Sequence, residues 1–423
     1  MISRFILAGL LVSTAYTQTY STHQDPILDT YIRQALERNP AVLESFARYQ
    51  SSLQRLPQES SLPDPMLGFT QFARSPETRV GAQTMMLSLS QEFPWFGKLS
   101  DKGKIAAKQA AAHRQHYEAQ NAEIVRQVKL AYYSVSYIDR AIEINQEDLS
   151  VLQHYETLAQ AQYTQGVGLQ QAVVKLQTEI TRDQNRLEVL RSQRVNAEAV
   201  LNSLMDRPAN SPIQKIEQGA RPRPEMNYGE LLVTGRNNRP EIQAALLQIE
   251  KDEKRIHLAR KSYWPNFTIA TSFTNVTGRS DPMGQMNLPD QNGKNIYSFS
   301  VGINIPFQRR KYDAAVREAT EDKIASRESY RDIVNEVEAS IRTIGFRLET
   351  LETQIALFEN TLLPQTEHTL TITEVAYSTG SVGVLDLLDS ERVLLEVRLG
   401  LARLISNYMK SLAEMERTIG MPF

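Results

Sequence analysis

The chain carries an internal repeat, and this feature limits its fold more than any other. Asn39-Pro40 recurs as Arg239-Pro240, and Tyr163-Thr-Gln-Gly166 recurs as Tyr377-Ser-Thr-Gly380. Two alternating runs that end in proline, at 87–94 and 299–306, recur in the same order. Self-similarity at a long period indicates two copies of one structural unit rather than two unrelated domains.

Each copy reads as helix, strand, strand, long helix, turn and long helix. The first repeat is expected at 18–208, with strands at about 65–74 and 83–93 and long helices at about 101–163 and 170–204. The second is expected at 225–423, with strands at about 266–276 and 296–305 and long helices at about 313–377 and 385–419. A Pro-rich polar connector at 209–224 joins them, and Pro364 is expected to kink or break its helix.

The first residues read as a secretion signal. Arg4 precedes a short apolar run, which is followed by small or hydroxylated residues through Thr17. The run is much shorter than the roughly 20 residues that a membrane-spanning helix needs. We therefore expect a signal peptide at 1–17, with a buried N-terminal helix as the alternative. No later apolar run is long enough to span a bilayer as a helix.

Composition and motifs exclude several classes of protein. The chain has no cysteine, so it has neither disulfides nor a thiolate metal site. Its net charge of −2 argues against a nucleic-acid partner. The sequence contains no phosphate-binding loop, zinc-protease pattern or nucleophile elbow. We therefore expect no catalytic residue, no cofactor and no metal site, and the protein is predicted not to be an enzyme.

The predicted strands alternate between an apolar face and a face of small or polar residues. In the last of them, Tyr297, Phe299 and Val301 share one face, while Ser298 and Ser300 share the other. This pattern is typical of membrane-barrel strands of about 9–11 residues, and a soluble sheet packed on one side is the alternative. Aromatic residues after the second strand and before the third would form a girdle at one membrane interface. They are Phe93, Trp95, Phe96, Tyr263 and Trp264.

Four strands cannot close a barrel, because small barrels need about eight. Open sheet edges do not occur in lipid, so several copies of the chain must contribute strands. Three copies give twelve strands and a plausible pore, whereas two copies give eight strands and an interior filled by side chains. An ordinary helical bundle or filamentous coiled coil would explain the helices, but not the strand pairs.

Three segments resemble the TolC-type outer-membrane efflux proteins, and the resemblance covers nearly all of the mature chain. They are Ser90-Gln-Glu-Phe-Pro-Trp-Phe-Gly-Lys98, Ala161-Gln-Tyr-Thr-Gln-Gly-Val-Gly-Leu169 and Ala376-Tyr-Ser-Thr-Gly-Ser-Val-Gly-Val-Leu-Asp-Leu-Leu-Asp389. The Phe-Pro-Trp-Phe-Gly-Lys form is similar to members that serve heavy-metal efflux pumps. The resemblance implies an α+β membrane protein: a homotrimeric, twelve-stranded transmembrane β-barrel, four strands per protomer, continuous with a long periplasmic α-helical coiled-coil barrel.

The resemblance also assigns roles to both helix-to-helix turns, which in the family form the periplasmic tip where adaptor hairpins bind. The corresponding residues are Tyr163, Gly166, Gly168, Leu169, Tyr377, Gly380, Val382 and Gly383. Asp386 and Asp389 match a pair of aspartates that would form carboxylate rings at the pore constriction; ordinary charge placement near a helix start is the alternative. The first repeat departs from this pattern, with Ala172 and Lys175 at the aligned positions. Some members carry a basic latch residue where this chain has Val382.

The resemblance implies an outer-membrane exit duct with its helical tunnel in the periplasm, embedded in outer-membrane lipid. Its partners would be two further copies of the chain, a periplasmic adaptor and an inner-membrane pump, expected to be of the RND type. Two alternatives stay open: an exit duct for polypeptides secreted by a type I system, and a periplasmic coiled-coil adaptor or scaffold with a small soluble sheet.

Overall fold

The computed structural model describes residues 25–224 and 227–423, and the expected signal peptide at 1–17 lies outside them. The chain divides into two compact units. The helical unit consists of the described residues of 25–47, 115–243 and 332–423, and the strand unit of Arg48–Arg114 and Ala244–Arg331. In the described ranges, no helix is both long enough and apolar enough to cross a membrane.

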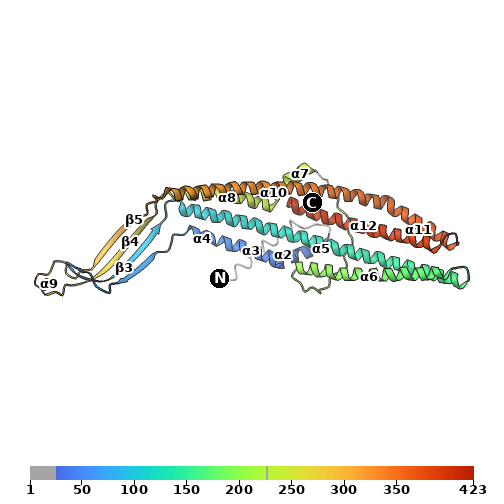
Figure 1. Cartoon of the computed structure of the whole chain (residues 1–423), viewed down its shortest axis with the longest axis horizontal. Coiled ribbons are helices and arrows are strands. Elements are labelled where there is room, and N and C mark those ends of the chain that lie inside the picture. The colour runs from blue at the N-terminus through green and yellow to red at the C-terminus, as the bar shows by residue number, and fades with distance from the viewer. Residues whose placement is uncertain (1–24, 225–226) are drawn as a thin grey trace. The chain divides into compact units, whose positions relative to one another are not determined.

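The strand unit contains one antiparallel sheet in the order β1-β3-β4-β5, and a short β2 pairs with β3 (Figure 1). Leu87 of β3 lies opposite Phe273 of β4, which in turn lies opposite Tyr297 of β5. The central β3–β4 pair therefore joins one strand from each repeat. The bounds are β1 Met66–Gln71, β2 Glu77–Thr78, β3 Gly81–Phe93, β4 Phe267–Thr277 and β5 Ile296–Ile303.

The two end strands of this sheet, β1 and β5, each have one free edge within the described residues. All eight residues of β5 are exposed, including Phe299 and Val301 at 71% and 61%. A soluble sheet would bury its apolar face against a core. Here the described chain leaves that face uncovered, which favours a sheet that meets lipid and neighbouring copies.

The long helices come from the second part of each repeat (Figure 1). The helix expected at 101–163 begins three residues earlier, and the segment expected at 313–377 begins four residues earlier and is divided by a π-helical turn. That turn ends two residues before Pro364, whose ring would clash with the carbonyl four residues earlier in a regular α-helix. The bounds are α5 Lys98–Thr164, α6 Gln170–Leu204, α10 Arg309–Leu357, η1 Phe358–Leu362, α11 Leu363–Ser378 and α12 Val384–Ile419.

Shorter helices precede the strands of each repeat. Pro40 and Pro240 both occupy the first position of a helix, where the missing N–H costs no hydrogen bond. The sequence did not indicate the one-turn helix in the loop at 277–295. The bounds are α2 Pro26–Arg38, α3 Pro40–Leu53, α4 Arg55–Ser60, α7 Tyr228–Asn238, α8 Pro240–Lys261 and α9 Pro282–Met286.

The helical unit has two main apolar clusters. One joins α2, α5, α6 and the connector, with Val128, Leu201 and Ile216 at its centre. The other joins α5, α6, α11 and α12 next to the turns, with Leu176 and Leu387 fully buried. The connector is part of this core, since Ile216 is buried and its N–H donates to Asp139 at 2.9 Å.

Candidate functional site

The two helix-to-helix turns have the same backbone geometry. Gly166 and Gly380 have φ of +77° and +72°, in the left-handed region that glycine adopts without strain. Each glycine N–H donates at 3.0 Å to the carbonyl of the tyrosine three residues earlier, Tyr163 or Tyr377. The next N–H in each turn closes a wider loop, from Val167 to Gln162 and from Ser381 to Ala376.

The side chains around the turns differ between the repeats. Tyr163 is 41% exposed, whereas Tyr377 is 6% exposed and belongs to the apolar cluster. Burial raises the pKa of the Tyr377 hydroxyl. Val167 and Leu169 project from the first turn at 78% and 72% exposure. The first turn therefore presents apolar surface, while the second is anchored to the core by its tyrosine.

The two aspartates near the second turn lie on the exposed side of α12. Leu387 and Leu388 between them are buried in the cluster, so Asp386 and Asp389 face away from it. The Asp386 carboxylate also accepts the Gly383 N–H at 3.0 Å, which caps the helix. Asp386 thus has a structural role of its own, and Asp389 is the cleaner probe of a role in the pore.

Three of the five aromatic residues predicted for the membrane interface come together: the Trp95 ring contacts Phe96 and Trp264, whereas Tyr263 packs on Tyr312. The rings of Trp95 and Trp264 stack with centroids 4.9 Å apart, although their repeats are distant in sequence. Lys98 ties the two segments by donating to the Trp264 carbonyl at 2.8 Å. Phe96 and Trp264 are 80% and 53% exposed. Phe93, Trp95 and Tyr263 are half-buried.

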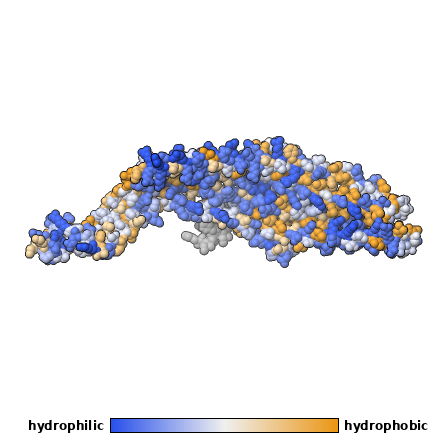
Figure 2. Space-filling model, in the orientation of Figure 1, coloured by the Kyte–Doolittle hydropathy of each residue, from blue (hydrophilic) through white to orange (hydrophobic). Residues whose placement is uncertain are grey.

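A role of these five residues at a membrane interface stays a prediction. Figure 2 shows apolar and pale residues over the strands, between hydrophilic loops at one end and the hydrophilic start of α10 at the other. This distribution suits an interface between lipid and water.

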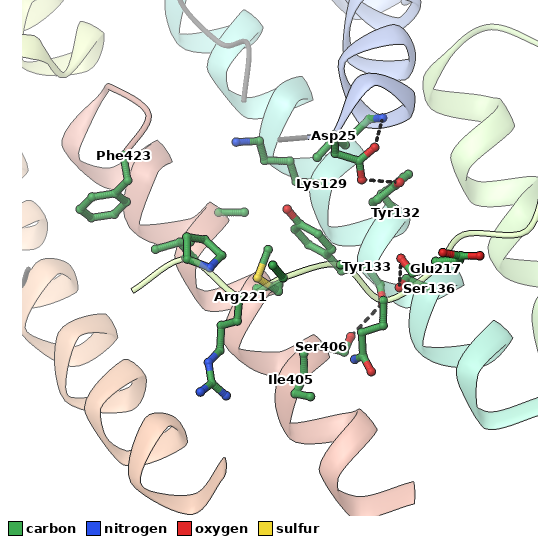
Figure 3. A pocket seen from close by; sticks show the side chains of 18 of the residues that line it. Asp25, Lys129, Tyr132, Tyr133, Ser136, Glu217, Arg221, Ile405, Ser406 and Phe423 are labelled. Atoms are coloured by element: carbon green, nitrogen blue, oxygen red, sulfur yellow. Dashed lines mark hydrogen bonds between the residues drawn. The ribbon is translucent and has the colours of Figure 1, made fainter. Parts of the chain in front are cut away.

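Nothing in the sequence indicated a cavity of about 560 Å³ in the helical unit (Figure 3). Its walls come from the N-terminal end of α2, from α5, from α12 and from the connector. In its wall Lys129, only 3% exposed, makes an ion pair of 2.6 Å with Glu416. Tyr132 donates to Asp25 at 2.6 Å, and burial together with this bond raises the pKa of the tyrosine. These two pairs satisfy each other's polar groups, whereas Nε and Nη1 of Arg221, which also lines the cavity, are buried without a hydrogen-bond partner.

Sequence reasoning also missed three buried carboxyl groups near the turns: Asp148 of α5, Asp183 of α6 and Glu391 of α12. The three residues are far apart in sequence, and no motif connects them. The signal that could have identified them is an acidic residue at a position where the helical periodicity predicts an apolar, core-facing one.

The exposed apolar strands, the paired glycine turns and the long helices together define an outer-membrane channel protomer. Residues 31–206 and 231–421 match the family model of the outer membrane efflux proteins, and the chain belongs to this family. Members of the family are outer-membrane channels of tripartite efflux systems rather than enzymes. The fold is the predicted one, a twelve-stranded barrel shared by three protomers with helices in the periplasm.

Individual relatives are distant in sequence and close in fold. Nodulation protein T of Rhizobium leguminosarum bv. trifolii is 20% identical over 424 residues, which cover 95% of this chain and 87% of that protein. The solved structure of CusC is 18% identical with a TM-score of 0.78, over 96% of this chain and 94% of that one. The open MtrE channel of Neisseria gonorrhoeae is 19% identical with a TM-score of 0.76, over 94% and 90%.

Proposed function

We propose that the protein is the exit duct of a tripartite exporter and passively conducts small solutes or metal cations. An inner-membrane pump of the RND type would deliver them through a periplasmic adaptor. The observation that carries the proposal is the pair of matching turns, with an exposed apolar surface on one and exposed carboxylates beside the other. The heavy-metal branch is supported by the sequence from Phe93 to Lys98.

The pore constriction is proposed at Asp386 and Asp389. Both lie within the first two turns of α12 and both are exposed in the protomer. In a trimer, each would be present three times around one axis. Rings of carboxylates attract cations and repel anions, which gives a passive channel its preference for cations.

Asp389→Asn is expected to lower the cation-to-anion permeability ratio of the channel in planar bilayers. The fall should be several-fold, because losing about 1 kcal/mol of attraction changes a ratio by about fivefold. Glu188→Gln removes an exposed carboxylate from α6 and is the matched control, expected to leave the ratio unchanged. An unaltered ratio in the Asp389 variant would reject the assignment.

Adaptor docking is proposed at the turns, where Val167 and Leu169 are exposed. Replacing both with glutamate should abolish site-specific crosslinking to the adaptor in cells, because a desolvated apolar contact cannot accept unpaired charges. Val195→Glu adds a charge at a 62% exposed position within α6 and should preserve crosslinking. Equal crosslinking in both variants would place the adaptor elsewhere.

A further inference from the structure

Three carboxyl groups are buried where three helices of the helical unit meet. Asp148 of α5 and Asp183 of α6 are each 5% exposed, and Glu391 of α12 is 6% exposed. They lie beyond the apolar cluster that contains Leu176 and Leu387, on the side away from the turns. Carboxylates are almost never buried unless they are paired, so this cluster needs an explanation.

The hydrogen bonding of the cluster is incomplete while its carboxyl groups are ionised. Oδ1 of Asp148, Oδ2 of Asp183 and Oε2 of Glu391 are buried and have no hydrogen-bond donor. Asp148 nevertheless lies within hydrogen-bonding reach of both Glu391 and Asp183. Two carboxylates cannot bond to each other, because both are acceptors, but a protonated carboxyl group donates to a neighbouring carboxylate. Bound protons would supply the missing donors.

The surrounding charges do not neutralise the cluster. Arg186 of α6 makes a 3.0 Å ion pair with Asp183 and is the cation next to the three acids. From α5, Tyr155 faces the cluster and donates to Glu374 of α11, which adds a further carboxylate on that side. Burial and the contact with Glu391 raise the pKa of Asp148 to about 7, and burial and the contact with Asp148 raise the pKa of Asp183 to about 7.

The described chain offers no sign that a metal ion replaces these protons. Within residues 25–224 and 227–423, no group of three or more potential ligands is arranged to hold one. A shared proton is the ligand that fits carboxyl groups in direct contact.

We propose that Asp148, Asp183 and Glu391 form a proton-binding site that fastens α12 to α5 and α6. Protonated, the site is a hydrogen-bonded network across three helices. Deprotonated, it places three negative charges in a buried space beside one arginine, and α12 is driven away. The proton concentration of the periplasm would thereby set how readily the helices beside the turns separate. This last step rests on the proposed function.

The direction of the effect follows from the pKa values. The pKa values of Asp148 and Asp183 both lie above the usual value for aspartate. The folded protein therefore holds more protons than the unfolded chain between about pH 4 and pH 7. The stabilisation is complete below about pH 4 and is lost as the pH rises through about 7. We therefore expect α12 to be held against α5 and α6 at acidic pH and to be released at pH 8 and above.

Two measurements on the purified full-length protein test the site without any transport assay. The first is infrared titration of the protonated-carboxyl band from pH 5.5 to 8.5. The band should titrate with a midpoint near 7 and lose that step in Asp148→Asn/Asp183→Asn. Glu188→Gln, which removes an exposed carboxylate from α6, is the control and should retain the step. If the wild type has no step, or if the double variant keeps it, the site is rejected.

The second measurement is the distance between α6 and α12. Since the chain has no cysteine, spin labels can be placed through Val189→Cys and Val393→Cys alone. The label distance should lengthen or broaden at pH 8.5 relative to pH 5.5, and the double variant should keep the short distance at both. An unchanged distance in the parent, or a shift that persists in the double variant, would overturn the proposal. Neither readout depends on conduction, so a failure of the proposed function would be recognised separately.

Discussion

Lys129→Met is expected to lower the free energy of unfolding of the helical unit by about 3–5 kcal/mol. Lys129 is 3% exposed and its partner Glu416 is 12% exposed, with 2.6 Å between Nζ and Oε2. Removing the lysine leaves the largely buried Glu416 carboxylate without its cation, and an unpaired buried charge costs much more than the pair contributes. The measurement is the denaturation midpoint of the purified protein in detergent.

The controls separate burial from charge. Arg191 and Glu188 form an exposed ion pair on α6, and Arg191→Met should change stability by less than about 1 kcal/mol. Lys129→Met/Glu416→Leu removes both buried charges and should recover most of the loss. If Lys129→Met proves as mild as Arg191→Met, the ion pair is not buried in the assembled protein.

Gly81→Ala is expected to prevent assembly of the sheet. Gly81 begins β3 with a φ of +124°, and a Cβ there would lie 1.8 Å from the carbonyl oxygen of Thr277 in the neighbouring strand. The backbone strain alone costs about 1–3 kcal/mol, and the contact adds to it because a paired backbone cannot move aside. The yield of folded oligomer from membranes should fall sharply.

Gly302→Ala is the matched control in the same sheet. Gly302 lies in β5, and the nearest atom to an added Cβ is the Thr268 Cβ at 3.9 Å, an ordinary contact. Its yield should equal that of the parent. Equal yields for the two variants would show that the end of β3 tolerates a different backbone.

The strands and turns could be predicted because their signals are local. Alternation from Tyr297 onward requires only neighbouring residues, and the turn glycines at Gly166 and Gly380 follow from a backbone that other residues enter with strain. The sequence of one chain did not decide between a trimer and a dimer. The trimer was predicted from the family resemblance, and the matched residues confirm the family.

The buried polar groups could not be predicted because their partners are distant in sequence. Lys129 and Glu416 are separated by 287 positions, and on its own helix each reads as a solvated residue. Asp148 likewise can be recognised as part of a buried carboxyl cluster only when Glu391 is seen to pack beside it. Charged residues on long helices are usually exposed. Only the packing of the helices against one another shows which of these charged residues are buried.

The most direct test of the account is the mass of the purified protein in detergent. The free edges of β1 and β5 require neighbouring copies, and twelve strands require three. The expected result, after subtraction of bound detergent, is three times the mass of one polypeptide chain. A monomer or a dimer would contradict the shared barrel and, with it, the assignment of this protein as a channel protomer.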